Sequence, residues 1–344
     1  MRSDGLYDSL SKTAEALSGR RVDSVVPAAA GGNNRIYRVR CERQEFALKC
    51  YPPRDQDPRE RASTEFNALR FLERYCPGRA PRAYAVNAAG GYLLLEWIEG
   101  SRVAEVGPSE VDAAVAFLSA LFNASARPEA RDMPPASEAC LSGEEVVRQL
   151  LDREAKLRAA AGDEQALREF LDHEFAPVRE RLVEQARAGY AEAELDFTTA
   201  LVPASRSLVP SDFGFHNAIR SAEGVLIFVD HEYFGWDDPV KVTADFILHP
   251  ATPLADDMAE RFWLGVCGHR ENDESFLVRL KLLYPLFGAR WCLILLNEFI
   301  PERWVGRLFA GARRDWTSVK AEQLRRSRDL LREVLTKSRG LFDE

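Results

Sequence analysis

The sequence predicts an α+β protein with two lobes, a small β-sheet region followed by a larger helical region. Three observations carry this prediction: strand-like runs dominate the first third of the chain, helical patterns dominate the rest, and one loop and hairpin segment interrupts the helices. The chain has 344 residues, of which 46% are hydrophobic, so it is long enough to bury a core in each lobe.

The first third is expected to form an antiparallel sheet with one inserted helix. Residues 36–40 and 46–51 are short β-prone runs, and a Gly-Gly-Asn-Asn turn at residues 31–34 precedes the first of them. Residues 59–75 instead place apolar side chains three and four residues apart, which favours a helix. Residues 91–98 then return to a clear strand pattern.

After residue 100 the pattern becomes helical. Residues 109–125 and 142–188 have the apolar spacing of helices, as does the chain from residue 254 to its end. Between these helices, residues 207–246 are mostly loop-like, and residues 225–229 form the clearest strand within them. This insertion contains the most unusual residues of the chain.

Charge and composition exclude several classes of protein. The net charge of -8 argues against nucleic-acid binding, because phosphate backbones are bound by an excess of Lys and Arg. The six cysteines form no C-x-x-C pair, so they predict neither a zinc site nor a disulfide framework. The N-terminus lacks the apolar run of a signal peptide, and no run approaches the roughly 20 apolar residues of a membrane span. We therefore expect a cytoplasmic protein that contacts no membrane.

Three oxygen-bearing side chains stand out in the insertion. Asp212 is followed five residues later by Asn217, and Asp230 ends the next apolar run. A carboxylate and an amide oxygen are the hard ligands that Mg²⁺ requires, and a second carboxylate can orient a hydroxyl and accept its proton. Each residue alone also fits an ordinary turn or cap. The joint spacing is much more specific, because it matches a phosphoryl-transfer loop followed by a metal ligand.

These residues resemble those of the aminoglycoside phosphotransferase and choline kinase families, which share the protein-kinase-like fold. Residues 230–233, D-H-E-Y, are similar to the D-F-E-Y of choline kinases, and residues 235–239, G-W-D-D-P, are similar to the G-x-x-D-P of the families. The resemblance extends from residue 22 to residue 246. It implies an N-lobe of residues 1–99, a helical C-lobe of residues 100–344, and ATP in the cleft between them.

The resemblance also implies roles for individual residues. Asp212 would be the catalytic base, and Asn217 and Asp230 would hold Mg²⁺. Nucleotide contacts would come from a glycine turn over the phosphates, a strand lysine with its helix glutamate, and a hinge that meets adenine. The matching residues here are Gly31, Gly32, Asn34, Lys49, Glu65, Glu96, Trp97 and Ile98. The turn by itself is also an ordinary hairpin, and Glu60 and Glu73 are rival partners for the lysine.

One position departs from the family pattern, because Pro210 and Ser211 stand where His-Gly usually precedes the catalytic Asp. That His supports the loop by packing and hydrogen bonding. Two hypotheses therefore stay open: an active small-molecule kinase, and a catalytically weakened, pseudokinase-like module that binds nucleotide. His216 is either a residue that stabilises the loop or an ordinary surface or core imidazole.

The acceptor is expected to be a hydroxyl of a small molecule, such as a sugar, an aminoglycoside-like compound or an amino alcohol. No A-P-E and no activation segment rich in Ser and Thr follows Asp230, so a peptide platform is not indicated. Glu232, Asp237 and Asp238 could face a cationic acceptor, but the latter two fit equally well as turn and cap residues. A neutral acceptor fits as well, because motifs do not specify the pocket wall. The oligomeric state also stays open.

Overall fold

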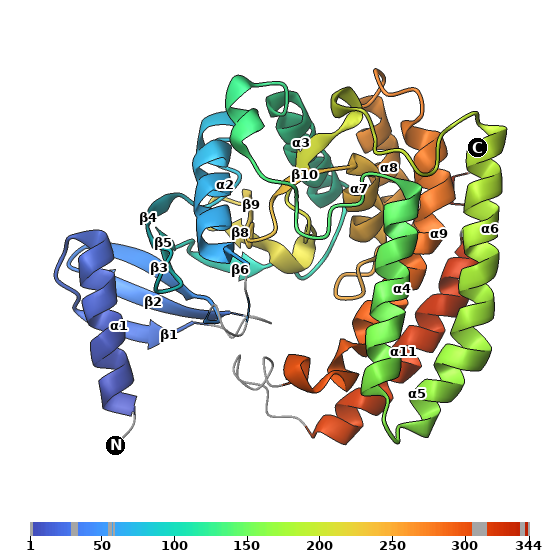
Figure 1. Ribbon diagram of the computed structural model, residues 1–344. Helices are drawn as coiled ribbons and strands as arrows, with labels where there is room; N and C mark the ends of the chain where they lie inside the picture. The colour runs from blue at the N-terminus through green and yellow to red at the C-terminus, as the bar shows by residue number, and fades with distance from the viewer. Residues whose placement is uncertain are drawn as a thin grey trace.

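A computed structural model describes residues 3–28, 34–53, 57, 59–304, 315–337 and 341–342. An antiparallel sheet at the N-terminal end is followed by a mainly helical region, as Figure 1 shows. This arrangement confirms the predicted α+β, two-lobed fold.

The N-terminal sheet has five antiparallel strands in the order β1-β2-β3-β5-β4. The strands are β1 Ser24–Pro27, β2 Arg35–Cys41, β3 Gln44–Cys50, β4 Ala83–Asn87 and β5 Tyr92–Glu96. Side chains alternate between the two faces of a strand. On β3, Phe46 and Leu48 belong to the apolar cluster under one face, whereas Ala47 belongs to the main core on the other. Lys49 follows the alternation of Ala47 and so lies on the same face as Ala47.

Two helices cover this sheet, whereas the sequence predicted one. The predicted helix is α2 Arg61–Tyr75, whose Leu69 and Leu72 pack in the main core. The second, α1 Ser3–Ser18, buries Leu10 and Ala14 with residues of the opposite face of the sheet. Helix α1 therefore covers apolar strand residues that would otherwise face water.

The chain enters the helical region through a second, smaller sheet. Its order is β6-β8-β9, with β6 Gly100–Arg102, β8 Ala218–Ser221 and β9 Leu226–Phe228. A Cβ at Gly100 would lie 2.2 Å from the carbonyl oxygen of Arg220, so only glycine allows this approach. A further pair joins β7 Ser207–Val209 to β10 Gly235–Asp237. Together these strands fix the loop and hairpin segment beside the N-terminal lobe.

The helical region contains the following α-helices: α3 Pro108–Ala124, α4 Gly143–Ala160, α5 Gln165–Glu169, α6 Ala176–Glu192, α7 Pro239–Leu248, α8 Asp256–Gly268, α9 Phe276–Leu295 and α11 Trp316–Lys337. Its short helical turns are η1 Pro128–Asp132, η2 Phe170–Phe175, η3 Pro203–Ser205, η4 Phe215–Asn217 and η5 Leu296–Phe299. The stretch predicted as helical over residues 142–188 is divided, because Gly162 adopts a left-handed φ of 44° after α4 and the chain reverses there.

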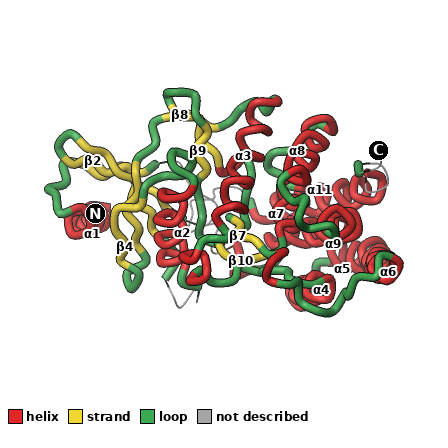
Figure 2. The backbone as a smooth tube through the Cα atoms, turned by 90° about the horizontal axis from the view of Figure 1, so that it is seen from above, coloured by secondary structure: helices red, strands yellow, loops and turns green. Residues whose placement is uncertain are grey.

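Helix α9 lies at the centre of this region, among α4, α6, α7 and α11 (Figure 2). In the described part of the chain, residues 276–299 are the one helical segment long and apolar enough to cross a membrane. Most of this segment is buried inside the protein, and its Arg279 and Arg290 form buried ion pairs with Asp238 and Asp245. These features are those of a core helix, whose apolar surface is covered by neighbouring helices.

Candidate active site

The segment that carries Asp212 is a loop fixed by two buried aromatic rings. Phe213 and Phe215 both pack on Phe246 of α7, with ring centroids 5.3 and 5.2 Å away. Because these rings fix the loop in the core, the positions of the polar residues before and after them are fixed as well. The side chains of Asp212 and Asn217 stay partly exposed.

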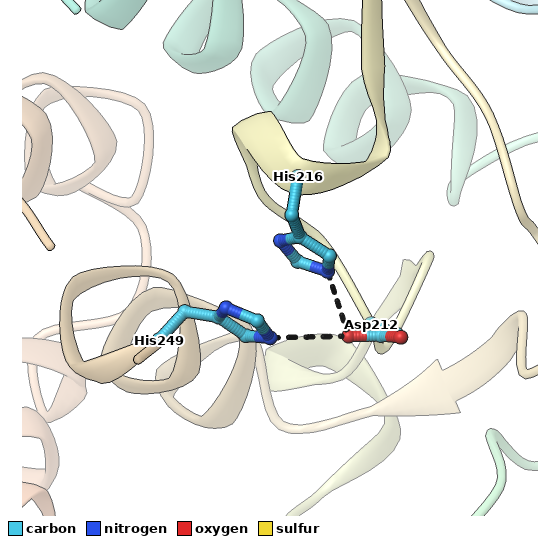
Figure 3. Close-up of side chains that lie close together, drawn as sticks. All are labelled: Asp212, His216 and His249. Carbon is cyan, nitrogen blue, oxygen red and sulfur yellow. Dashed lines mark hydrogen bonds and ion pairs between the residues drawn. The ribbon is translucent and has the colours of Figure 1, made fainter. Parts of the chain in front are cut away.

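Two histidines contact the Asp212 carboxylate (Figure 3). The Nε2 atoms of His216 and His249 lie 3.2 and 3.7 Å from Asp212 Oδ1, and the two rings stack with centroids 3.7 Å apart. The N–H of Ala251 donates to His249 Nδ1, so a neutral His249 carries its proton on Nε2, facing the carboxylate. Burial tends to raise the pKa of Asp212, but the histidines outweigh it and hold that pKa well below its usual range. Asp212 is therefore ionised at neutral pH.

The residues that replace His-Gly are themselves bonded. Ser211 has a left-handed φ of 69°, and its hydroxyl accepts a hydrogen bond from Lys241 Nζ at 3.2 Å and donates to the carbonyl oxygen of Ser137 at 3.4 Å. His216 contacts the carboxylate of Asp212, the residue that follows Ser211. The loop thus has hydrogen-bonded support without the His-Gly pair, and His216 occupies the loop-stabilising position.

Lys49, Glu65 and Asp230 meet although they come from β3, from α2 and from the segment after β9. Lys49 Nζ lies 2.5 Å from Glu65 Oε2 and 2.5 Å from Asp230 Oδ1. The lysine and Glu65 are buried, whereas the Asp230 side chain is 33% exposed and so can reach a ligand. Glu65 is thus the α2 carboxylate that pairs with Lys49, and Glu73 pairs with Arg70 at the surface.

A third carboxylate belongs to this group. Glu232 is buried, lies 3.6 Å from Lys49 Nζ, and accepts hydrogen bonds from Arg61 Nη1 at 2.8 Å and Asn34 Nδ2 at 2.7 Å. Its carboxylate is therefore bonded to residues of the protein. It does not face a cationic acceptor, although the sequence left that role open. Four residues form what we call the Asp230 cluster: Lys49, Glu65, Asp230 and Glu232.

The Asp230 cluster has the composition of a site for a hard divalent cation. Carboxylate oxygens of Glu65, Asp230 and Glu232 lie within 4.8 Å of one another. Burial raises the pKa of Asp230 and of Glu232, and neighbouring carboxylates raise both further against the effect of Lys49. The Nδ2 of Asn217 donates to the Asp212 carbonyl at 3.0 Å, which leaves the amide oxygen as the ligand atom. These surplus oxygen donors fit Mg²⁺, the metal that the fold implies.

Comparison with known protein families decides which family this arrangement belongs to. The profile of the phosphotransferase enzyme family APH matches residues 24–263, more than half of the chain. The chain belongs to this family. The match includes both the Lys49 strand and the segment with Asp212 and Asp230. No curated protein sequence matches the chain.

Solved structures of phosphotransferases share the fold. The choline kinase LicA from Streptococcus pneumoniae is 17% identical with a TM-score of 0.58, and the match covers 94% of this chain and 99% of that one. A spectinomycin phosphotransferase, APH(9)-Ia, is 11% identical with a TM-score of 0.60, covering 97% and 98%. A gentamicin complex of APH(2")-IIa is 15% identical with a TM-score of 0.57, covering 97% and 98%. At such identities these matches establish the fold of the APH-family chain.

Two acids of the G-W-D-D-P segment have structural partners in this family member. Asp237 is fully buried, accepts a hydrogen bond from the N–H of Cys140 at 2.6 Å, and lies 3.2 Å from Lys241 Nζ. Asp238 caps α7 through a backbone N–H of the first turn and pairs with Arg279 at 3.1 Å. Asp238 therefore has the cap role that the sequence offered as an alternative, whereas Asp237 ends β10 as a buried hydrogen-bond and ion-pair partner. Neither side chain is free to face a cationic acceptor, because burial and internal partners occupy them.

The predicted hinge residues lie at the end of β5 and in the connection from β5 to β6. Glu96 ends β5, where its N–H donates to the Arg82 carbonyl at 2.9 Å and its carboxylate accepts from the Arg82 N–H at 3.1 Å. Trp97 lies beneath the guanidinium of Arg38, 4.7 Å from the ring centroid, and Ile98 is half-buried. The backbone of this short connection is thus fixed at both ends by strands.

The remaining nucleotide contacts predicted from the sequence are at the turn before β2. Gly31 and Gly32 lie outside the described residues. Asn34 is buried beside the Asp230 cluster, and its Oδ1 has no hydrogen-bond partner within the described part of the chain. A buried acceptor without a partner is costly, so a ligand or water that donates to Asn34 would be stabilised there.

Three contact residues were absent from the sequence-based site. The hydroxyl of Tyr51 donates to Glu65, Arg61 pairs with Glu232, and His249 approaches Asp212. Arg61 could have been found, because it precedes Glu65 by four residues and so shares its face of α2. No spacing rule links His249 to Asp212, because helix α7 separates them in the sequence.

Proposed function

We propose that this protein is an ATP-dependent kinase that transfers the γ-phosphoryl group to a hydroxyl of a small molecule, with Mg²⁺ as cofactor. One observation carries the proposal: Asp230 lies 2.5 Å from Lys49 Nζ, and the partly exposed Asp212 precedes it on the same loop and hairpin segment, held by two histidines. A carboxylate beside a lysine and surplus carboxylates is the set of groups that phosphoryl transfer to a hydroxyl requires.

Asp212 is the proton acceptor in the proposed reaction. A bond forms between the acceptor oxygen and the γ-phosphorus while the bond from that phosphorus to the β-phosphate oxygen breaks, and ADP leaves. The hydroxyl proton passes to Asp212. Because the pKa of Asp212 is lowered, it orients the hydroxyl first and takes the proton late, when bond formation has made the hydroxyl acidic.

The Asp230 cluster serves the donor nucleotide. Burial tends to lower the pKa of Lys49, but the carboxylates around it outweigh this and raise the pKa, so the ammonium keeps its charge for the phosphates. Glu65 of α2 holds the lysine in place, and Glu65 in turn accepts a hydrogen bond from the hydroxyl of Tyr51, the residue after β3. Asp230 and Asn217 would hold Mg²⁺, which neutralises charge on the phosphoryl oxygens when bound.

The solved relatives support both substrates. One is described in complex with AMP and another with ADP and spectinomycin, which supports an adenine nucleotide as donor. The AMP-bound protein, LicA, is described as a choline kinase and a Plasmodium vivax protein as an ethanolamine kinase, which supports a small-molecule acceptor.

The test is an ADP-release assay over a library of hydroxyl compounds, with each hit confirmed by the mass of one added phosphoryl group. We expect Asp212→Asn to lower kcat by about 10²–10⁴, the usual contribution of a general base. The control is Asp329→Asn on α11, whose side chain is 50% exposed and which should keep full turnover.

Nucleotide binding is measured in parallel by thermal shift with ATP and Mg²⁺. Retained binding with lost turnover in Asp212→Asn supports the assigned role, and unchanged turnover contradicts it. Binding by the unmodified protein without turnover on any acceptor would favour the pseudokinase-like module instead.

A further inference from the structure

A cavity of 950 Å³ runs along one face of α4. The α4 residues that line it recur at helical spacing, from Glu145 through Gln149 and Arg153 to Ala160. With a rise of 1.5 Å per residue, this face is about 22 Å long. Residues 300–303, which follow η5, also line the cavity. We call this cavity the α4 groove, and its volume is within the range of small-molecule sites.

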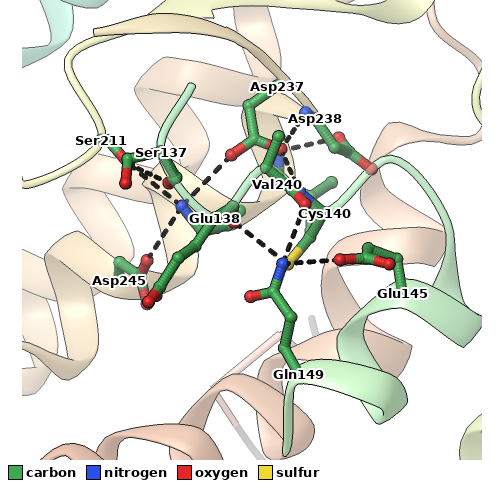
Figure 4. A network of polar contacts seen from close by, with 12 residues as sticks. Ser137, Glu138, Cys140, Glu145, Gln149, Ser211, Asp237, Asp238, Val240 and Asp245 are labelled. Atoms are coloured by element: carbon green, nitrogen blue, oxygen red, sulfur yellow. Dashed lines mark hydrogen bonds and ion pairs between the residues drawn. The ribbon is translucent and has the colours of Figure 1, made fainter. Parts of the chain in front are cut away.

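The α4 groove adjoins the loop that carries the proposed base. The carbonyl oxygen of Ser137 accepts the hydrogen bond of Ser211, the residue before Asp212. The residue after Ser137, Glu138, lines the groove. Figure 4 shows Glu138 beside Ser211, with Gln149 of α4 on the other side. The Glu138 end of the groove is therefore connected to the loop of the proposed base through Ser137.

The acidic residues of α4 that line the groove, Glu145 and Asp152, are already paired with an arginine. Arg148 donates to Glu145 and to Asp152, at 2.6 Å in each case, and Glu145 also accepts from Gln149 at 2.8 Å. These carboxylates are partners of one arginine within the same helix. They are therefore weak candidates for binding a cationic acceptor.

Arg153 and Arg290 meet at Glu138, near the catalytic loop. One oxygen of Glu138 accepts from both Arg153 and Arg290, the latter at 2.7 Å, and Arg290 also pairs with Asp245. Burial and the charges of Arg290 and Arg303 lower the pKa of Arg153, and Glu138 only partly offsets this. Within the described residues, Arg153 thus has one acidic partner, and it shares that carboxylate with Arg290.

Arg153 has hydrogen-bond donors to spare. Its side chain is 16% exposed, and one of its amino groups donates to Glu138. Within the described residues, its Nε and its other amino group have no acceptor. Three exposed charged residues also line the groove: Lys156, Glu302 and Arg303. Two of these three are cations.

We propose that the α4 groove binds the acceptor, and that this acceptor carries a carboxylate or a phosphate in addition to the hydroxyl that is phosphorylated. The inference rests on the proposed function, because it takes the groove as the acceptor site of a kinase. A guanidinium with unused donors presents parallel N–H groups that match an oxyanion. Lys156 and Arg303 add positive charge at the rim.

The test is a binding titration with sugars of different charge, in the presence of Mg²⁺ and a non-hydrolysable ATP analogue that fills the nucleotide site. The probes are glucuronate and glucose 6-phosphate, neutral glucose, and cationic glucosamine. We expect the anionic sugars to bind about tenfold or more tightly than the other two, the usual effect of charge-assisted hydrogen bonds.

Variants identify the residue responsible. Arg153→Gln should remove the preference for anions, and Arg303→Glu, at an exposed position that does not threaten folding, should weaken it. The matched control is Arg158→Gln on the same helix, where Arg158 pairs with Glu154 and Asp172 outside the groove and should keep the preference. Thermal unfolding verifies that each variant is folded.

Equal affinity for the three charge classes, including no binding by any of them, overturns the inference, as does tighter binding of glucosamine or an unchanged preference in Arg153→Gln. The two proposals fail separately. If anion binding depends on Arg153 but no acceptor is turned over, the proposed kinase activity is rejected and the proposed anion site stands. If a neutral or cationic acceptor is phosphorylated and Arg153→Gln does not change the rate, the proposed kinase activity stands and the proposed anion site is rejected.

Discussion

Asp212 and Asp230 belong to the same loop and hairpin segment, yet their surroundings shift their pKa values in opposite directions. Asp212 contacts two histidines, which outweigh the effect of burial and lower its pKa. Asp230 lies among other carboxylates with one lysine, and burial together with those carboxylates raises its pKa. The first carboxylate is ionised without any ligand, whereas the second gains from an added cation.

This difference separates two roles that residue type alone cannot separate. Environments that push the pKa values of two acids apart are the usual way in which a protein assigns them different chemistry. Asp212 is suited to a hydroxyl and its proton, and Asp230 to a metal ion. Four substitutions around the two acids probe this contrast.

The largest expected effect follows from Asp230→Asn. Loss of the carboxylate should reduce kcat/KM by about 10³ or more, because a metal ion supplies several kcal/mol of transition-state stabilisation. The stabilisation of the protein by ATP should also lose its dependence on Mg²⁺. The melting temperature without ligand should not fall, since the cluster has more carboxylates than cations. A marked loss of stability would show that Asp230 is a structural partner of Lys49 first.

Lys49→Met, in the same cluster, should have the opposite effect on stability. It removes the cation from among three carboxylates, and an unpaired buried charge costs about 3–5 kcal/mol of unfolding free energy. Urea unfolding measures the loss. It should shrink at acid pH, because the pKa values of Asp230 and Glu232, already raised, rise further without the lysine.

The control for this variant is Lys12→Met on α1. Lys12 pairs with Asp8 at the surface, and its side chain is 72% exposed, so its removal should leave stability unchanged. Equal losses in the two variants would mean that the buried cluster is no more sensitive than a surface pair.

His231, next to Asp230, extends the contrast to histidines. It is buried, donates to the Phe228 carbonyl at 2.9 Å, and burial lowers its pKa to about 4. In the unfolded chain the His231 imidazole is protonated below about pH 6.5, whereas in the folded protein it is protonated only below about pH 4. Stability is therefore lost as pH falls through this window, by about 3 kcal/mol in total.

His231→Phe should remove that loss, because phenylalanine has no proton to bind and suits a site flanked by Phe117 and Phe234. Urea unfolding at a series of pH values provides the measurement. His269→Gln serves as the control, since His269 is exposed. The same acid sensitivity in wild type and His231→Phe would contradict a neutral buried His231.

Sequence patterns predicted the parts of the site that depend on local spacing. Asp212, Asn217 and Asp230 lie on one continuous segment, and strand alternation with helical periodicity accounts for the meeting of Lys49 with Glu65. The patterns did not predict the contacts that residues from distant parts of the sequence make with the site. The loss of the motif histidine suggested a weakened loop, but a residue beyond α7 contacts Asp212 instead. The α4 groove was also unpredicted, because its charge balance depends on which side chains pair across helices.

The smallest expected effect concerns His249, a positioning residue for Asp212. His249→Ala should lower kcat about tenfold, because a carboxylate free to rotate orients the hydroxyl less well. The KM for ATP should not change, since His249 contacts the base and not the Asp230 cluster. The histidines lower the pKa of Asp212 against the effect of burial, so losing one raises that pKa and moves the acid limb of kcat/KM to higher pH. His249→Gln, which keeps a donor near the Nε2 position, should restore most of kcat and of the profile. A merely structural role would lower stability without moving the acid limb, and an unmoved limb in His249→Ala would reject the positioning role.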